Sequence, residues 1–300
     1  MLINTFGVVV GTAACNAHCP YCVSRQTGPV RSPGKQVLTR HRNWQAALKL
    51  AATAGTTTLL ITGKGEPTLY PDDITHFLKA AESSSLAIKE LQTNGLAIGD
   101  AIHAEQKPPP RMLEFLPTWV RNHGLNTVAI SVVGVHDGQN ARIFRRDYPP
   151  LADTVRYLRQ LQLTVRLSVS LLKGYVDSPD KLDEVIEWAR EHDVLQVTAR
   201  AIRSAWSSND DKASLFVRDH ALTKAQERRI TEHVDSPYKL RFSHGATLYS
   251  HRGRNICLTD CLTTPTEPDH IRTLIYHATN GQLDYDWYEG ATLLSGVPIS

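Results

Sequence analysis

The chain lacks the hydrophobic segments that would place it in or across a membrane. No run approaches the roughly 18 apolar residues of a membrane-spanning helix, and residues 1–4 do not open a charged region followed by a long apolar segment and a cleavage site. Internal repeats and low-complexity tracts are also missing. We therefore expect a cytoplasmic protein with an ordinary globular fold and no membrane partner.

Strong charge of either sign is missing as well. The 33 Lys and Arg residues against 30 Asp and Glu give a net charge of +3, which argues against a groove for nucleic acid. Cysteine is scarce, and its five residues are grouped at positions 15, 19 and 22 and at 257 and 261. This odd number and this grouping favour metal chemistry in a reducing compartment over a disulfide framework.

Three of the cysteines form a compact motif directly after the apolar run Phe6 to Val10. Cys15, Cys19 and Cys22 have the spacing C-x3-C-x2-C. Closed zinc sites and most iron–sulfur clusters take four protein ligands, commonly four cysteines. A [4Fe–4S] cluster held by three cysteines leaves one iron open to a small chelating molecule. The alternative interpretation is a set of zinc ligands or reactive thiols.

The motif resembles the signature of radical S-adenosylmethionine (radical SAM) enzymes, in which an aromatic residue, here Tyr21, precedes the last cysteine. The neighbouring Thr12-x-x-Cys15-Asn16 resembles the opening of the molybdenum-cofactor cyclase branch. The resemblance implies a [4Fe–4S] cluster on the three cysteines, with S-adenosylmethionine (SAM) bound at the open iron. It further implies reductive cleavage of SAM to a 5′-deoxyadenosyl radical that takes hydrogen from the substrate, and an external one-electron reductant such as flavodoxin or ferredoxin.

Strand and helix patterns alternate along the rest of the chain. Strands are expected at 3–11, 57–62, 87–93, 125–132, 163–172 and 195–202, and helices at 43–54, 71–84, 111–123, 150–162 and 180–192. The six strands with the helices between them match the α/β fold that the resemblance implies, an open (β/α)6 partial TIM-like barrel over residues 1–235. Residues 236–300 are expected to form a C-terminal extension with a β-hairpin across Asn280-Gly281, which closes the barrel and contributes to the substrate site.

The ends of the strands carry the candidate SAM-binding residues, because βα loops converge at that edge of a barrel. Gly63-Lys64-Gly65-Glu66-Pro67 resembles the GGEP element of the family, with Lys64 where glycine is commoner. By the resemblance, Gly65 and Glu66 hold the amino group of SAM. The further candidates are Tyr21, Gly63, Asn94, Ser131, Arg166, Ser168, Ser170 and Arg200. Turn chemistry or a buried polar side chain satisfied by backbone also accounts for several of them.

Arginines indicate the class of substrate. Arg142, Arg145, Arg146, Arg200 and Arg203 favour a small polar, anionic metabolite of nucleotide or purine-like type. We expect its pocket between the ends of the fourth to sixth strands and residues 244–290. A second interpretation is modification of a protein or peptide, for example activation of a glycyl-radical partner. A third is a non-catalytic zinc or iron–sulfur binding module.

The second group of cysteines supports three hypotheses. Cys257 and Cys261 lie in one short stretch with His244 and His251. They could bind a second cluster or a metal, they could be buried thiols, or one could be a catalytic cysteine that donates a hydrogen atom. The sequence leaves the catalytic residues, the exact substrate and the oligomeric state open.

Overall fold

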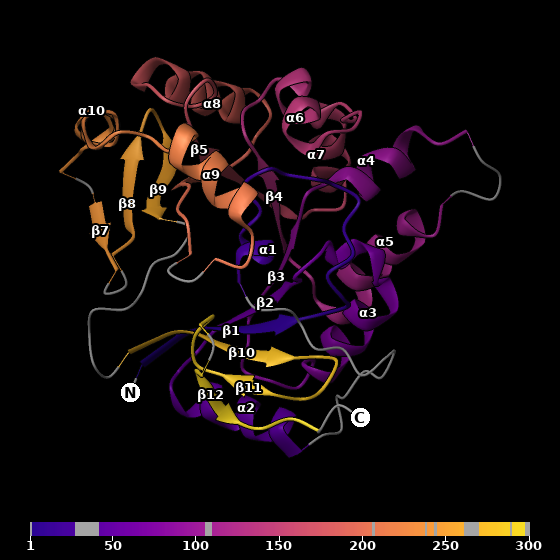
Figure 1. The fold of residues 1–300 in the computed structure, drawn as a ribbon. Helices are drawn as coiled ribbons and strands as arrows, with labels where there is room; N and C mark the ends of the chain where they lie inside the picture. The colour runs from indigo at the N-terminus through magenta and orange to yellow at the C-terminus, as the bar shows by residue number, and fades with distance from the viewer. Residues whose placement is uncertain are drawn as a thin grey trace.

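Parallel strands form the middle of a single long sheet in the computed structural model, which describes residues 2–27, 42–105, 110–205, 208–237, 239–242, 245–260, 270–288 and 290–297. The sheet order is β12-β11-β10-β1-β2-β3-β4-β5-β6-β9-β8-β7 (Figure 1). Its central strands are β1 (Leu2–Val9), β2 (Thr58–Thr62), β3 (Ile88–Thr93), β4 (Thr127–Val132), β5 (Thr164–Leu171) and β6 (Gln196–Ala201). The expected α/β class and six successive parallel strands are confirmed.

Helices connect these strands, as parallel pairing requires. The expected ones are α2 (Arg42–Thr53), α3 (Pro71–Ala80), α5 (Met112–His123), α7 (Leu151–Gln160) and α8 (Pro179–Glu191). The structure adds α1 (Val23–Gln26), the 3-10 turn η1 (Pro67–Leu69), α4 (Leu96–His103), α6 (Asp137–Phe144), α9 (Asp211–His220) and α10 (Lys224–Val234). Within the part of the chain that the structure describes, no helix is long and apolar enough to cross a bilayer.

The C-terminal residues lengthen the sheet at both of its edges. On one side, β7 (Lys239–Arg241), β8 (Thr247–His251) and β9 (Arg254–Asp260) continue from β6, with β9 parallel to it. On the other side, β10 (His270–His277) pairs in parallel with β1 and is followed by β11 (Leu283–Asp284) and β12 (Thr292–Leu294). The expected hairpin is present as β10–β11, although its second strand is short. The strands β7 and β12 remain the two edges, so strand pairing does not close the sheet.

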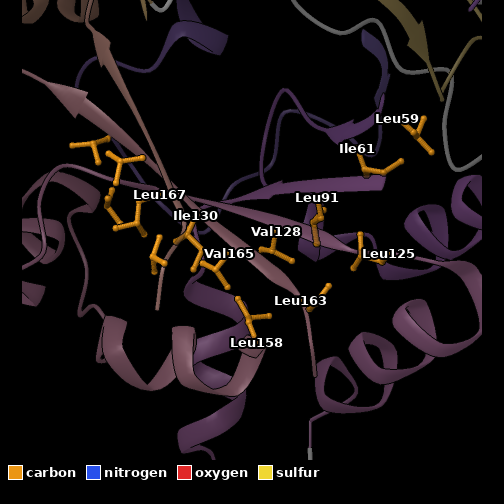
Figure 2. Close-up of a cluster of buried hydrophobic side chains, with 14 of the residues drawn as sticks. Leu59, Ile61, Leu91, Leu125, Val128, Ile130, Leu158, Leu163, Val165 and Leu167 are labelled. Carbon is orange, nitrogen blue, oxygen red and sulfur yellow. The ribbon is translucent and has the colours of Figure 1, made fainter. Parts of the chain in front are cut away.

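The two faces of the sheet differ in polarity, and β5 shows why. Its residues alternate strictly between half-buried and buried, with Arg166, Ser168 and Ser170 on one face and Val165 and Leu167 on the other. The apolar face packs on the helices, where Leu59, Leu91, Val128 and Ile130 join it in a continuous core (Figure 2). Each fully buried side chain of this size stabilises the fold by roughly 1.5–3 kcal/mol. The opposite face is polar, and it forms the floor of the candidate site.

An aromatic cluster fixes the added strand β10 against the core. The ring of Trp44 on α2 lies 5.3 Å from those of Phe6 on β1 and Tyr276 on β10, and 5.1 Å from that of Phe77 on α3, measured between centroids. All four side chains are essentially inaccessible to solvent. Because such large rings bury much apolar area, β10 is an integral part of the sheet.

Candidate active site

A cavity of about 480 Å³ opens at the carboxyl ends of the parallel strands, where the βα loops of such sheets place their ligands. The segment 13–25 after β1 forms one wall and contributes the three motif cysteines. Residues 62–67 after β2 form a second wall. The floor is formed by β3 to β5 and contains Gln92, Asn94, Ser131 and Ser170. The sequence motif, the GKGEP turn and three strand ends therefore meet at one place.

The cysteine loop is held by contacts that leave its thiols on the cavity wall. The backbone N–H of His18 donates to the carbonyl oxygen of Phe144 at 2.9 Å, and Arg25 Nη2 donates to the carbonyl oxygen of Cys19 at 3.0 Å. The ring of Tyr21 stacks on that of Phe216 on α9, with 6.2 Å between centroids. Cys15 is exposed, and Cys19 and Cys22 are half-buried.

Burial disfavours the charged forms of two of these thiols. Desolvation raises the pKa of Cys19 to about 12, and the negative charges of Cys22 and Cys15 act in the same direction. Neighbouring protein atoms also desolvate the sulfur of Cys15 in part, which raises the pKa of this thiol although the residue is accessible from solvent. Thiolates that are desolvated and repel one another need a bound cation to ionise together. The donor set therefore fits a metal cluster.

Gly65 is required by the way that the turn meets the cysteine loop. Its N–H donates to the carbonyl oxygen of Thr12 at 3.1 Å, and the N–H of Glu66 donates to that of Ala14 at 3.0 Å. A Cβ atom on Gly65 would lie 1.9 Å from the Ala14 carbonyl oxygen. The glycine thus permits direct backbone contact between the two walls of the cavity.

The carboxylate of Glu66 lies between the turn and β3 and is 3% exposed. Oε1 accepts hydrogen bonds from the hydroxyls of Thr93 and Thr68 at 2.6 and 2.7 Å and from the N–H of Thr68 at 3.1 Å. Oε2 accepts one from the N–H of Asn94 at 2.9 Å. Burial raises the pKa of Glu66, and these hydrogen bonds oppose the rise. Glu66 therefore links the GKGEP turn to the end of β3. Its Oε2 accepts one of these hydrogen bonds and its Oε1 accepts three.

Asn94 connects the end of β3 with the cysteine loop. Its Nδ2 donates to Asn16 Oδ1 at 2.7 Å and to the sulfur of Cys15 at 3.8 Å, while its Oδ1 accepts from the N–H of Leu96. Gly95 follows with φ +79° and begins α4. The turn chemistry that Asn-Gly indicates is present, and the asparagine also contacts one motif thiol.

Lys64 brings a positive charge to the cavity wall. Its Nζ donates to the hydroxyl of Thr27 at 2.5 Å and lies 5.9 Å from the centroid of the Trp287 ring. Burial lowers the pKa of Lys64, and the charge of Cys22 opposes the change. Trp287 follows β11, so this cation–π contact links the C-terminal residues to the GKGEP turn.

The candidate polar residues of β4, β5 and β6 form two groups, those that line the cavity and those that do not. Ser131 and Ser170 line the cavity. Arg166 forms an ion pair with Glu90 on β3, on the same polar face of the sheet as Ser168. Arg200 lies opposite Ser170 in register, and its Nε is buried with no hydrogen-bond partner among the described residues. Burial and the charges of the neighbouring arginines lower the pKa of Arg200 to about 10.

None of the five arginines of the predicted substrate group is among the residues that line the cavity. Arg142 and Arg145 are exposed. Arg146 forms an ion pair with Asp100 at 2.8 Å, and Arg203 forms one with Glu227 on α10 at 2.8 Å. Arg200 is therefore the member of the group that the fold directs toward the interior.

Cys257 lies on β9, opposite Thr198 of β6, and is half-buried. Burial raises the pKa of its thiol, while the charges of Arg166, Arg200 and Arg272 lower it. Cys261 and His244 lie outside the described residues, so the hypothesis of a metal site shared by the two cysteines stays a prediction.

Comparison with known proteins decides the family. The family model described as the radical SAM superfamily matches residues 9–191, which is more than half of the chain. The chain belongs to the radical SAM superfamily. Among curated proteins no match was found. The superfamily match names no branch, so the likeness to the molybdenum-cofactor cyclases stays a prediction.

Solved structures of radical SAM enzymes share the fold. SuiB from Streptococcus suis bound to S-adenosylmethionine aligns with a TM-score of 0.58 and 16% identity, over 94% of this chain and 60% of SuiB. SuiB bound to its precursor peptide SuiA aligns with a TM-score of 0.54 and 14% identity, over 94% of this chain and 59% of SuiB. The chain thus spans about 60% of the length of these relatives. At this identity the likeness concerns the fold.

The cofactors of the superfamily, a [4Fe–4S] cluster and SAM, fit the site. Three thiols share one cavity wall, and the volume of about 480 Å³ lies within the usual range for organic ligands. Gln92, His18 and Phe144 also line the cavity, and sequence reasoning did not include them. The alternation along β3 could have identified Gln92, since it shares a face with Glu90. Nothing in the local sequence indicates Phe144, which reaches the site through the tertiary fold.

Proposed function

We propose that this radical SAM enzyme takes a hydrogen atom from a small, polar, anionic metabolite of nucleotide or purine-like type. The observation that carries the proposal is the position of Arg200. Its guanidinium lies on the polar face of the sheet beside the cavity-lining Ser170, and its Nε has no partner within the described chain. A buried N–H group without an acceptor costs free energy, so this position favours a ligand that brings an acceptor, and an anion suits the guanidinium best.

The local balance of charge supports an anionic ligand. The carboxylate of Glu90 already pairs with Arg166 and accepts a hydrogen bond from Gln92 at 3.3 Å. The charges of both Arg166 and Arg272 act on Arg200 and lower its pKa. Positive charge therefore exceeds negative charge around Arg200. A carboxylate or phosphate suits this position, because guanidinium binds both in a bidentate manner.

The proposal assigns the cofactor contacts to residues of the cavity walls. Cys15, Cys19 and Cys22 hold the cluster, and Oε2 of Glu66 with the backbone of Gly65 receives the amino group of SAM. We assign Ser131 and Ser170 to the ribose because both line the cavity, as do Gly63, Tyr21 and Asn94. Bound together and reduced, the cofactors supply the radical that abstracts hydrogen, and the chain positions the substrate and excludes water.

Arg166 and Ser168 do not line the cavity, so the proposal gives them no direct contact with SAM. Arg166 is engaged by Glu90, so we assign it to the charge balance around Arg200 and not to the carboxylate of SAM. Ser168 is half-buried between Arg166 and Ser170 on the polar face. It can reach the ribose or the substrate only when a ligand extends below the cavity floor.

The C-terminal residues 236–300 are proposed as an extension of the core 1–235 that helps to enclose the substrate. The contact between Lys64 and Trp287 supports this role, as does the pairing of β9 with β6 beside Arg200. The electron donor is proposed to be an external protein such as flavodoxin or ferredoxin. The proposed location is the cytoplasm, because free thiols that hold a cluster need a reducing compartment.

Formation of 5′-deoxyadenosine tests the substrate proposal. Cluster-loaded enzyme with dithionite and SAM would be supplied with anionic and neutral fractions of a small-molecule extract. We expect the anionic fraction to stimulate formation. Arg200→Met should weaken that stimulation by about 100-fold or more. The anion of the substrate would then lack its partner, and breaking a buried ion pair costs roughly 3–5 kcal/mol. The matched control is Arg203→Met, because Arg203 pairs with Glu227 away from the cavity.

The binding of SAM, measured separately, distinguishes the possible roles of Arg200. Unchanged affinity for SAM in Arg200→Met supports a substrate role. A parallel loss of SAM affinity would instead assign the residue to the cofactor, and stimulation by the neutral fraction alone would contradict the proposal.

Modification of a peptide is the second candidate function. It is favoured by the likeness of 94% of this chain to SuiB bound to its precursor peptide. It predicts that a polypeptide fraction, and no small molecule, stimulates 5′-deoxyadenosine formation. The third interpretation, a non-catalytic metal-binding module, predicts no cleavage of SAM under any reducing condition.

A further inference from the structure

Two histidines and one aspartate converge at the joint between the barrel core and the C-terminal strands. Asp183 lies on α8, His233 on α10 and His251 on β8, and these elements adjoin in the upper left of Figure 1. Nε2 of His233 is 2.9 Å from Oδ2 of Asp183, and Nε2 of His251 is 3.1 Å from Oδ1. None of the three lines the cavity described above.

The geometry suits a small transition-metal ion. The three ligand atoms lie within 4.8 Å of one another. Around a tetrahedral zinc with bonds of about 2.0–2.1 Å, two ligand atoms lie about 3.3 Å apart. The two histidine nitrogens contact different oxygens of Asp183, at distances slightly shorter than this, so one ion is reached by a small outward shift of both imidazoles and is held by either or both carboxylate oxygens. Imidazole nitrogen and carboxylate oxygen are both ordinary zinc ligands.

The three side chains are held together in a sheltered position that solvent can still reach. They are sheltered, with exposed fractions of 13% for Asp183, 16% for His251 and 31% for His233, so a water molecule can still complete the coordination. Nη2 of Arg252 contacts Oδ2 of Asp183 at 2.8 Å. Burial alone would raise the pKa of Asp183, but hydrogen bonds from the two histidines and the charge of Arg252 lower it. Arg252 orients the carboxylate from outside the ligand set, and zinc binding would displace the proton that each histidine Nε2 donates to Asp183.

We propose that Asp183, His233 and His251 bind one zinc ion, which fastens α10 and β8 to α8. The function of this site is structural. It joins three elements that are far apart in the sequence, on the side of the sheet where β9 extends β6 next to Arg200. Because the ion is bound by the folded chain only, its binding stabilises the attachment of these C-terminal elements to the core. The site does not depend on the proposed substrate.

Metal content tests the proposal on the cluster-loaded enzyme. Anaerobic protein is equilibrated with buffered zinc, passed over a weak chelating resin, and analysed for zinc and iron in the same sample. We expect about one zinc per chain at constant iron. Asp183→Asn, His233→Gln and His251→Gln should each abolish zinc retention, and these near-isosteric changes keep the iron content as a check on folding. His76→Gln, at an exposed position of α3, should retain zinc.

Stability gives a second readout. Zinc at about 100 times its dissociation constant should raise the ratio of folded to unfolded wild-type protein about 100-fold, and it should leave the three variants unchanged. Zinc taken up with loss of iron would place the ion on the motif cysteines and overturn the proposal. Equal zinc retention in wild type and variants, or none in either, would also overturn it and leave a hydrogen-bonded His–Asp–His network.

Discussion

The contact between the GKGEP turn and the cysteine loop gives the sharpest test, through Gly65→Ala. The added Cβ would lie 1.9 Å from the Ala14 carbonyl oxygen, whereas real Cβ atoms essentially never approach closer than 3.0 Å, so the two walls must separate by at least 1.1 Å (3.0 minus 1.9). Such a shift breaks the hydrogen bonds of Gly65 to Thr12 and of Glu66 to Ala14. Two lost bonds of about 0.5–1.5 kcal/mol each and overpacking of about 1–3 kcal/mol outweigh the gain of about 0.4–1 kcal/mol from a stiffer unfolded chain.

We therefore expect Gly65→Ala to lower the free energy of unfolding by about 1–5 kcal/mol. It should also reduce iron incorporation, because the displaced segment carries Cys15. Urea denaturation and iron analysis after anaerobic reconstitution measure the two effects. Gly138→Ala is the matched control, since a Cβ there meets nothing within 4 Å. If Gly65→Ala bound as much iron as the wild type and unfolded at the same urea concentration, the close contact would not exist as described.

Three further predictions concern single side chains. Cys19→Ala should reduce iron from about four per chain to background, whereas Cys257→Ala should leave it unchanged; about eight irons in the wild type would instead make Cys257 a ligand of a second cluster. Asn94→Leu removes the amide that donates to the sulfur of Cys15. The reduced cluster then loses a stabilising hydrogen-bond donor, so its midpoint potential should become more negative. An unchanged potential in a redox titration would contradict this role. Hydrogen bonds hold the pKa of Asp284 below its ordinary value of 3.8 although burial opposes them. Its ionised form therefore stabilises the protein above pH 3.8, and this contribution is lost as the pH falls further. The urea midpoint of Asp284→Asn should therefore fall less steeply with decreasing pH than that of the wild type. Parallel plots of midpoint against pH for the two proteins would contradict this role of Asp284.

Strong local patterns allowed much of the fold to be predicted. The strand over 163–172 alternates between polar and apolar residues, and the structure places β5 at Thr164–Leu171 with that alternation intact. The helix expected at 180–192 starts with a cap from Ser178 and a proline in its first turn. In contrast, α4 follows the Asn-Gly turn directly, and the turn signal concealed the helix. The pairing of β9 with β6 and of β10 with β1 was not foreseen, since strand partners distant in sequence leave no local pattern.

For the site, the sequence by itself determined the chemistry, and the tertiary structure decided the geometry. The spacing of Cys15, Cys19 and Cys22 identified a three-thiol cluster motif, because ligands close in sequence are close in space in any fold. The arginines were different, since five candidates had equal standing in the sequence. Packing left four of them exposed or ion-paired away from the cavity, and register placed Arg200 beside Ser170 on the polar face. The convergence of Asp183, His233 and His251 likewise arises only when α8, α10 and β8 pack together, because the histidines follow Asp183 by 50 and 68 positions and no local spacing joins them to it.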